Sequence, residues 1–288
     1  MCKIRHIATS RKGSVFIAAE YEQKVYCYDL NSYRCISRFN TVLDFGGKRL
    51  AVSNDGTQCV AAAYHTHGIA MYDILTGCTI WERKDIKKTQ FVTFDPSDEK
   101  LYIGISDKPM VIINSRNGCD DEKIRSTEKV RFDCSSPEKT LCQNRQTVKL
   151  LGSKIESPTF TFLDFIGIGT GAVLSAVGND LMFYDYREQK ITWRITPGKG
   201  WHFVQLAYSE KSNTVYAILY NYIGERTELY QLYGISASDG AIKVIFPLPD
   251  DAYEFGFAQD TSKLICSSGE IYELSCQEPK LAHLLFGT

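Results

Sequence analysis

A short segment with a Tyr-Asp pair returns along this chain at a nearly constant spacing, and this repetition constrains the fold most. The first copy spans residues 24–36, KVYCYDLNSYRCI, and is typical of a strand, a turn and a second strand. The repeated position holds Tyr28-Asp29, Tyr72-Asp73, Tyr184-Asp185, Tyr272-Glu273 and, in a weaker copy, Asn114. Asp29 and Asp73 lie 44 residues apart, and Asp73 and Asn114 lie 41 residues apart. A β-rich repeat of roughly 40–45 residues indicates a propeller.

The chain divides into seven such units with no segment left over. We therefore predict an all-β fold, a seven-bladed β-propeller of four-stranded antiparallel blades in a single closed domain over residues 1–288. The predicted blades span residues 3–40, 49–83, 90–124, 129–163, 165–195, 203–247 and 253–286. Stacking the sheets around an axis hides both faces of each sheet. Unit four is the weakest, because its second run is short and polar, and ring closure is expected to use packing between the first and last units without a shared strand.

The Tyr-Asp pairs stand where WD-repeat proteins end their third strand in Trp-Asp. The chain therefore resembles a degenerate WD-repeat propeller over nearly its whole length. The Gly-His pair that opens a WD repeat is missing, and so is the buried Asp-His-Ser/Thr-Trp network that depends on it. The resemblance implies the propeller class and, as an expectation, the family's usual role as a protein-binding platform.

Composition indicates an ordinary globular protein with 44% hydrophobic and 23% charged residues. The formal net charge is −1, which argues against nucleic acid and against an anionic membrane as partners. No apolar run approaches the ~18–20 residues of a spanning helix, and no secretory signal is present at the N-terminus. The ten cysteines include no CxxC pair, so we expect reduced, unpaired and mostly buried thiols in a cytoplasmic protein.

Motifs for catalysis, metals or cofactors each have a simpler structural interpretation. The glycine run 167–171, GIGTG, precedes a strand-like segment instead of the helix that a dinucleotide site needs. His65 and His67 supply two ligands where zinc needs three or four. Neither GxSxG nor CxxC occurs, and the repeated acids, Asp29 among them, fit turn capping better than catalysis. We predict no catalytic residue, no metal site and no cofactor.

The candidate binding residues come from loop geometry. In a propeller, the loops between strands two and three and between successive blades share one face, and the short turns occupy the other. Aromatic and Arg residues in loops are typical of binding hot spots. The predicted partner-binding residues are Tyr64, His65, His67, Trp201, His202, Tyr220, Tyr222 and Arg226. For each one, an ordinary solvated loop is the competing interpretation, and Trp201 is either an interface anchor or a plug between blades five and six.

These observations predict a non-enzymatic, cytoplasmic propeller that binds a protein. A specific version is a bacterial immunity protein that neutralises a cognate toxin domain by direct binding. The alternative is an enzyme or small-ligand binder with its site at the central channel of the propeller.

Overall fold

The structure is a computed structural model that describes most of the chain. The described residues are 4–10, 14–20, 24–41, 48–63, 68–106, 108–124, 129–132, 140–144, 146–150, 153–159, 162–176, 180–223, 227–252, 254–258, 261–274 and 278–285. Within these ranges every regular element is a strand.

The strands form seven sheets, each made of consecutive strands. Blades one to three comprise β1 (Ile4–Thr9), β2 (Val15–Glu20), β3 (Lys24–Asp29), β4 (Cys35–Asn40), β5 (Lys48–Val52), β6 (Gln58–Ala63), β7 (Ile69–Asp73), β8 (Thr79–Arg83), β9 (Thr89–Phe94), β10 (Lys100–Ile105), β11 (Met110–Asn114) and β12 (Asp120–Ile124). Blades four and five comprise β13 (Lys129–Arg131), β14 (Leu141–Asn144), β15 (Thr147–Leu150), β16 (Phe162–Ile168), β17 (Gly171–Ala176), β18 (Leu181–Asp185) and β19 (Lys190–Ile195). Blades six and seven comprise β20 (Trp201–Ser209), β21 (Thr214–Ile223), β22 (Thr227–Ser236), β23 (Ile242–Leu248), β24 (Phe255–Phe257), β25 (Lys263–Cys266), β26 (Glu270–Glu273) and β27 (Lys280–Leu284).

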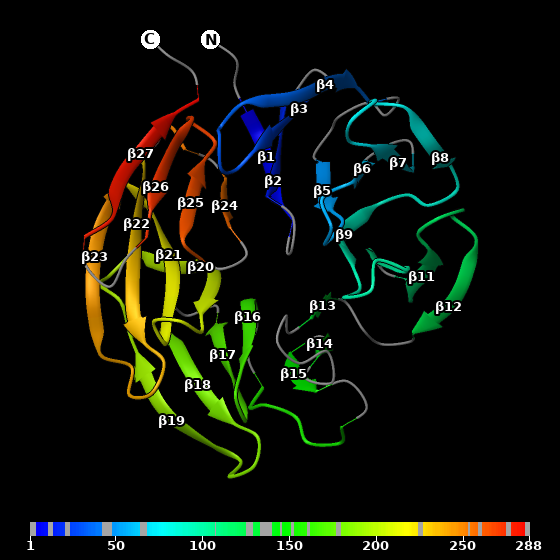
Figure 1. Ribbon diagram of the computed structural model, residues 1–288. Helices are drawn as coiled ribbons and strands as arrows, with labels where there is room; N and C mark the ends of the chain where they lie inside the picture. Colours follow the sequence, from blue (N-terminus) through cyan, green and yellow to red (C-terminus); the bar gives the residue numbers. More distant parts are fainter. Residues whose placement is uncertain are drawn as a thin grey trace.

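The fold is an all-β, seven-bladed β-propeller of antiparallel blades, as the repeat predicts (Figure 1). The first strand of each blade lies nearest the centre of the ring, and the last strand lies on its rim. Six blades have four strands, and the described part of blade four has three. An isolated bridge between Lys149 and Glu156 follows that three-stranded sheet.

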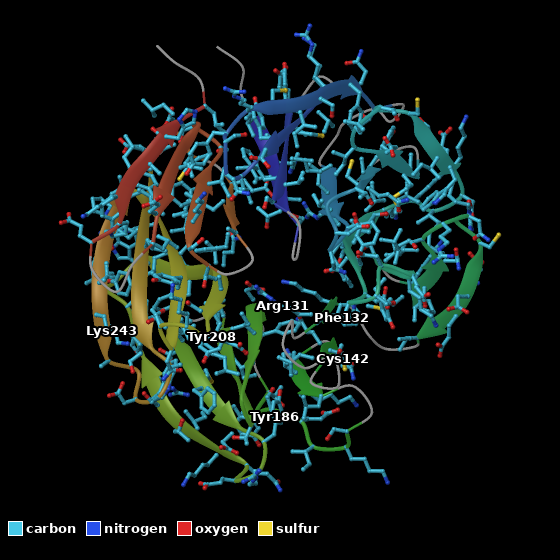
Figure 2. All side chains as sticks on the ribbon, viewed as in Figure 1. Arg131, Phe132, Cys142, Tyr186, Tyr208 and Lys243 are labelled. Carbon is cyan, nitrogen blue, oxygen red and sulfur yellow. The ribbon has the colours of Figure 1, made fainter. Side chains whose placement is uncertain are left out.

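Blade four, the weakest unit in sequence, is held by its neighbours. The Tyr186 hydroxyl of blade five donates a hydrogen bond of 2.8 Å to the Val148 carbonyl, and burial raises the pKa of Tyr186. On the other side, the rings of Tyr102 and Phe132 meet edge to face at 4.9 Å. Figure 2 shows Tyr186 and Phe132 on opposite sides of this blade.

The hydrophobic core is divided among the spaces between blades. Successive residues of a strand point to opposite faces of the sheet. Ala61 in β6 accordingly packs with Ile17 and Tyr72 on the side of blade one, whereas Ala62 packs with Leu101 and other residues of blade three. Because both faces are covered, the inner strands are apolar on both sides instead of alternating with polar residues.

The ring closes between blades one and seven without a shared strand, as expected from the sequence. Ile7 of β1 packs so closely on Gly256 of β24 that a Cβ there would lie 2.5 Å from Ile7 Cγ2. The Thr9 hydroxyl donates to the Phe257 carbonyl at 2.6 Å, and Nζ of Lys263 donates to the Leu30 carbonyl at the same distance. Packing and side-chain hydrogen bonds therefore close the ring.

The repeated acidic position ends the third strand of a blade and caps the turn that follows. Oδ1 of Asp73 accepts hydrogen bonds from the Thr76 N–H and hydroxyl, both at 2.8 Å. Equivalent bonds to the turn are made by Asp29, Asn114 and Asp185. Backbone N–H bonds are the main reason that the pKa values of Asp29, Asp73 and Asp185 lie below the usual range. The predicted turn-capping role is confirmed at Asp29, Asp73 and Asp185, and Asn114 makes the same bonds. For the fourth predicted acid, Glu273, the turn includes residues 275–277, which lie outside the described residues.

The capped turn also sets the spacing between neighbouring blades. In five blades the backbone has a positive φ four residues after the end of the third strand, and in blade six that strand ends at Ser236. These positions are Tyr33, Gly77, Gly118, Gln189 and Gly240. Trp81, on the outer strand of blade two, packs on Gly118 of blade three, and its Nε1 donates to the Ser115 carbonyl at 2.6 Å. Trp193 makes the same two contacts between blades five and six, with Gly240 and with Ala237. Trp81 and Trp193 thus each connect the outer strand of one blade to the capped turn of the next.

Candidate functional site

The hairpin of β21 and β22 in blade six is much longer than the corresponding hairpins. Both strands have ten residues. The third strand of blade six, β22, has ten residues and ends at Ser236, next to its turn. The corresponding strands β7 and β18 have five residues each and end at Asp73 and Asp185. At about 3.3 Å per residue, the five extra residues lengthen the hairpin by about 16 Å. The extension lies on the loop-rich face, opposite the capped turns.

The structure places Trp201 and His202 at the base of this extension. Trp201 begins β20 and pairs with Asn221, while His202 pairs with Tyr220. Since successive residues of a strand face opposite sides, the two side chains diverge. Trp201 packs on the core between blades five and six, while Tyr220 packs on the core between blades six and seven. The chain therefore brings His202 and Tyr220 together and directs Trp201 to the other side of the sheet.

Trp201 has features of both an anchor and a plug. The Trp201 side chain is half-buried. The Trp201 backbone N–H donates a hydrogen bond of 3.1 Å to the Gly198 carbonyl. Gly200, with φ of 85°, lets the chain pass close to Asn221, since a Cβ there would lie 2.9 Å from Asn221 Oδ1. The turn before β20 is thus closed by a backbone hydrogen bond and by the close approach of Gly200 to Asn221.

The remaining predicted residues are placed only in part. Tyr222 belongs to β21, opposite Glu228, and its side chain lies outside the described residues. The other four lie outside the described ranges: Tyr64, His65, His67 and Arg226.

Tyr230 is a candidate that sequence reasoning missed. It lies directly opposite Tyr220 in β22, with ring centroids 5.4 Å apart. Phe255 of blade seven lies against Tyr230 at 5.1 Å, so three aromatic rings support the hairpin where it leaves the ring. The signal lies in the run TELYQLY, but it becomes useful only when the strand register is known.

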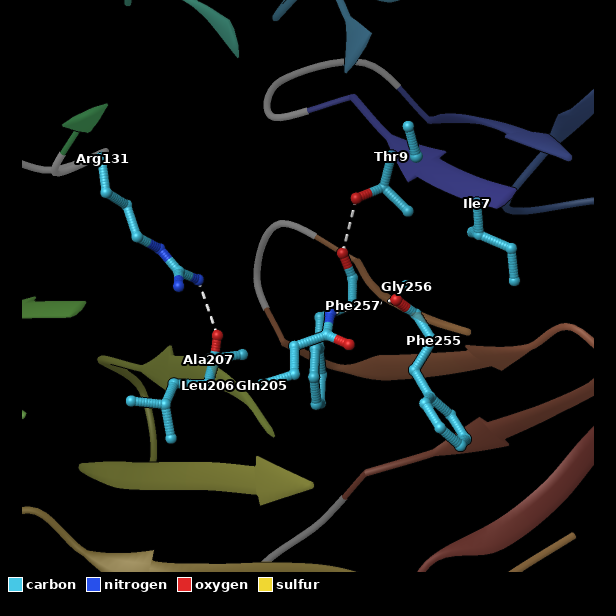
Figure 3. Close-up of a pocket in the computed structure, with 10 residues that line it drawn as sticks. Ile7, Thr9, Arg131, Gln205, Leu206, Ala207, Phe255, Gly256 and Phe257 are labelled. Carbon is cyan, nitrogen blue, oxygen red and sulfur yellow. Dashed lines mark hydrogen bonds between the residues drawn. The ribbon is translucent and has the colours of Figure 1, made fainter. Parts of the chain in front are cut away.

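A second candidate site is the centre of the ring. The inner strands of blades one, four, six and seven enclose a cavity of about 190 Å³ (Figure 3). Its polar lining side chains are Arg131, Thr9 and Gln205, and the other lining residues are apolar or glycine. Two of these side chains donate to backbone carbonyls, Thr9 to Phe257 and Gln205 to Phe255.

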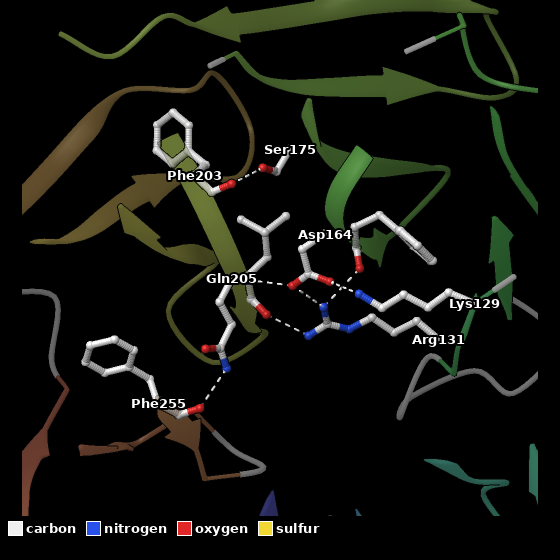
Figure 4. A network of polar contacts seen from close by, with 9 residues as sticks. Lys129, Arg131, Asp164, Ser175, Phe203, Gln205 and Phe255 are labelled. Atoms are coloured by element: carbon white, nitrogen blue, oxygen red, sulfur yellow. Dashed lines mark hydrogen bonds and ion pairs between the residues drawn. The ribbon is translucent and has the colours of Figure 1, made fainter. Parts of the chain in front are cut away.

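Arg131 belongs to a buried charge network that joins blades four, five and six (Figure 4). Its Nη1 lies 2.7 Å from Oδ2 of Asp164, and Nζ of Lys129 lies 2.9 Å from Oδ1. Nη2 of Arg131 donates to the Leu206 carbonyl, and the Leu206 N–H donates to Asp164. Burial alone would raise the pKa of Asp164, but the charges of Arg131 and Lys129 and their hydrogen bonds outweigh it and lower the pKa to about 2. These bonds connect inner strands, which indicates a structural role.

Several other functional features were sought in the described part of the chain. There, no group of three or more His, Cys, Asp or Glu residues could hold a metal ion. In the same residues, no helix is long and apolar enough to span a membrane. The glycine run 167–171 forms the turn between β16 and β17, with Gly169 at a positive φ. Among the described residues, seven cysteines are free thiols. Four of them are buried, Cys27, Cys59, Cys142 and Cys266, and three are exposed, Cys35, Cys78 and Cys119.

Comparisons with known proteins support the fold. No protein-family model matches the chain, and no curated protein matches its sequence. Among solved structures, the β-propeller domain of Cps50 (Swd1) from Myceliophteria thermophila matches with a TM-score of 0.70 and 12% sequence identity, over 92% of this chain and 93% of that chain. At this identity the likeness shows a shared fold alone. Because 1478 solved chains match, the fold by itself does not select a function.

Proposed function

We propose that this chain is a non-enzymatic propeller that binds another protein through its loop-rich face, with the blade-six hairpin as the main contact. The observation that carries the proposal is the five-residue extension of β22 beyond the third strands of blades two and five. Paired strands hold their backbone in place, so binding costs less ordering entropy than a loop of the same length would require. Aromatic residues at its base are typical of interface hot spots. The resemblance to WD-repeat proteins, whose usual role is protein binding, supports the same conclusion.

A narrower form of the proposal names the partner as a bacterial toxin domain that the propeller neutralises in the cytoplasm. A wide loop-rich face is a suitable shape for covering the active site of another protein. Coexpression of this chain with candidate toxins from its own host tests this form. Rescue of growth by the wild-type chain supports it, and the absence of rescue by any candidate rejects it while leaving protein binding itself open to the next experiment.

The hairpin is tested by shortening it. Replacing residues 222–228 with Asn-Gly closes β21 and β22 through a two-residue turn after the pair Asn221 and Leu229. The capped turns and blade cores are left intact, so we expect an unchanged melting temperature. Quantitative affinity capture from the host, followed by mass spectrometry, should show that the specific partner is lost.

A matched control changes an exposed apolar residue on the opposite face. Leu75 is 72% exposed in the capped turn of blade two, and Leu75→Ser should retain the partner. Retention of the partner by the shortened, folded variant would exclude the hairpin as the contact. Equal loss in both variants would indicate non-specific capture.

A further inference from the structure

Two adjacent loops on the loop-rich face carry a concentration of lysines. Residues 84–88 connect β8 to β9, and residues 106–109 connect β10 to β11. The Ser106 N–H donates to the Lys88 carbonyl at 3.0 Å, which joins the two loops into one surface. Four exposed lysines, here called the lysine patch, lie on this surface: Lys84, Lys87, Lys88 and Lys108.

The backbone of the patch is fixed. Lys88 has φ of 59°, a region that few residues other than glycine, Asn and Asp adopt. Its carbonyl is bound by Ser106, and the Lys108 N–H donates to the Ile105 carbonyl at 3.3 Å. Hydrogen bonds therefore hold the backbone at Lys88 and Lys108, and strained positions such as Lys88 are frequent at functional sites.

The two loops carry four lysines against two aspartates, Asp85 and Asp107, so their sequence has an excess of positive charge. Asp85, within the first loop, is held by Arg83 at 2.6 Å, and Arg83 also binds Asp120 at 2.9 Å. Lys84 lies 3.8 Å from Glu82. In the described part of the chain, Lys87, Lys88 and Lys108 form no ion pair with an acid. The patch thus keeps an excess of positive charge, although the whole chain has a net charge of −1.

The opposite side of the same face is acidic. The connection between β23 and β24 carries Asp250 and Asp251, both exposed. In Figure 1, this connection lies across the ring from β8 and β9. A long polyanion such as DNA would meet repulsion on crossing the face, whereas a folded protein can place a local acidic surface on the lysines alone. Charge complementarity of this kind directs association and fixes orientation.

We propose that the lysine patch docks an acidic surface of the protein partner. This inference rests on the proposed protein-binding function and adds the charge of the partner and a second contact on blades two and three. Because the lysines are exposed, their contribution is screened by salt. They increase the rate of association more than they slow dissociation, as is typical of charges at the rim of an interface.

The test uses a poly-glutamate peptide as the probe and the full chain. Four Lys→Gln substitutions, at Lys84, Lys87, Lys88 and Lys108, should weaken binding at ~50 mM salt by about tenfold or more, and ~200 mM salt should remove most of the difference. The matched control carries four Lys→Gln substitutions at exposed lysines elsewhere: Lys123, Lys211, Lys243 and Lys280. The control variant has the same net charge as the patch variant and should bind poly-glutamate as the wild type does.

Equal weakening in both variants would show that only net charge matters and would overturn the proposal. Duplex DNA binding to the patch more tightly than poly-glutamate would overturn it in favour of nucleic acid. The variant with the shortened hairpin should bind poly-glutamate as the wild type does. Failure of the hairpin proposal and failure of the lysine proposal therefore give different results.

Discussion

Asp164→Asn is the substitution that most directly tests how the blades are joined at the centre of the ring. The Asp164 carboxylate is buried, with Arg131 and Lys129 as partners and the Leu206 N–H as a further donor. Asn keeps the shape of the side chain and can still accept a hydrogen bond from Leu206. It removes the negative charge, which leaves two partly buried cations without compensation.

The expected loss of stability follows from the structure. Lowering the pKa of Asp164 from 3.8 to about 2 corresponds to about 2.5 kcal/mol of stability at neutral pH. Removing one partner of a fully buried ion pair costs about 3–5 kcal/mol in all, a range that already contains this contribution, and Arg131 and Lys129 are only partly buried. We expect the free energy of unfolding to fall by about 3 kcal/mol. The exposed pair of Lys100 and Asp121 has a similar separation, 2.7 Å, and Asp121→Asn should cost about 1 kcal/mol or less.

Urea unfolding at two pH values separates charge from packing. A carboxyl with a depressed pKa contributes fully above its unfolded pKa, and the contribution disappears as pH falls through the folded pKa. The difference between wild type and Asp164→Asn should therefore shrink by about 1 kcal/mol between pH ~7 and pH ~3. A cost at neutral pH no larger than that of Asp121→Asn would refute the role of this network, and a cost independent of pH would assign it to packing instead of charge.

Three further predictions concern particular side chains. Trp201→Ala should lower the free energy of unfolding by about 2 kcal/mol, measured in urea, because a half-buried Trp costs less than the ~3–5 kcal/mol of a fully buried one; no loss would make Trp201 purely an anchor. Gly118→Ala should lower the melting temperature more than Gly169→Ala. Both glycines have positive φ, but a Cβ at Gly118 would lie 2.9 Å from Trp81 while one at Gly169 meets nothing within 4 Å; equal shifts would mean that the blade contact adds nothing. In native protein, Ellman's reagent should react first with the exposed thiols of Cys35, Cys78 and Cys119. Rapid reaction of the buried thiols would contradict their packing: Cys27, Cys59, Cys142 and Cys266.

The blade pattern was predictable from sequence because the repeat and its turns are local signals. The Tyr-Asp position marks the end of the third strand, and glycines such as Gly77 and Gly118 occupy the positive φ that the following turn needs. The same turn forms in blade five, where Gln189 takes the positive φ, and in blade six, where Ser236 stands in the acidic position, so neither the acid nor the glycine alone marks every turn. Blade four was the hardest to predict, since its short strands depend on contacts from neighbours, such as Tyr186.

The candidate sites were less predictable because they depend on register and on contacts between distant segments. The length of the blade-six hairpin is visible in sequence, but which residues share a face is not. Trp201 and His202 form an obvious pair of neighbours in the chain, yet strand alternation sends them to different sides of the sheet. The Asp164 network joins residues 33 to 75 positions apart, and neither periodicity nor a motif reports such pairs.

The length of the blade-six hairpin bears directly on function, because the capped turn uncouples that length from the packing of the ring. Each third strand begins its contacts with neighbouring blades at the same turn, so residues can be added at the far end without disturbing the core. The lower part of the added length is stabilised by its neighbours: β20 pairs with β21 as far as Asn221, β23 pairs with β22 as far as Tyr230, and Tyr220, Tyr230 and Phe255 stack there. Only the pairs beyond Asn221 and Leu229 form a two-stranded hairpin, which by itself is marginally stable in water. The proposed function assigns the residues beyond that base to the contact with the partner protein, and the stacked rings fix where that contact begins.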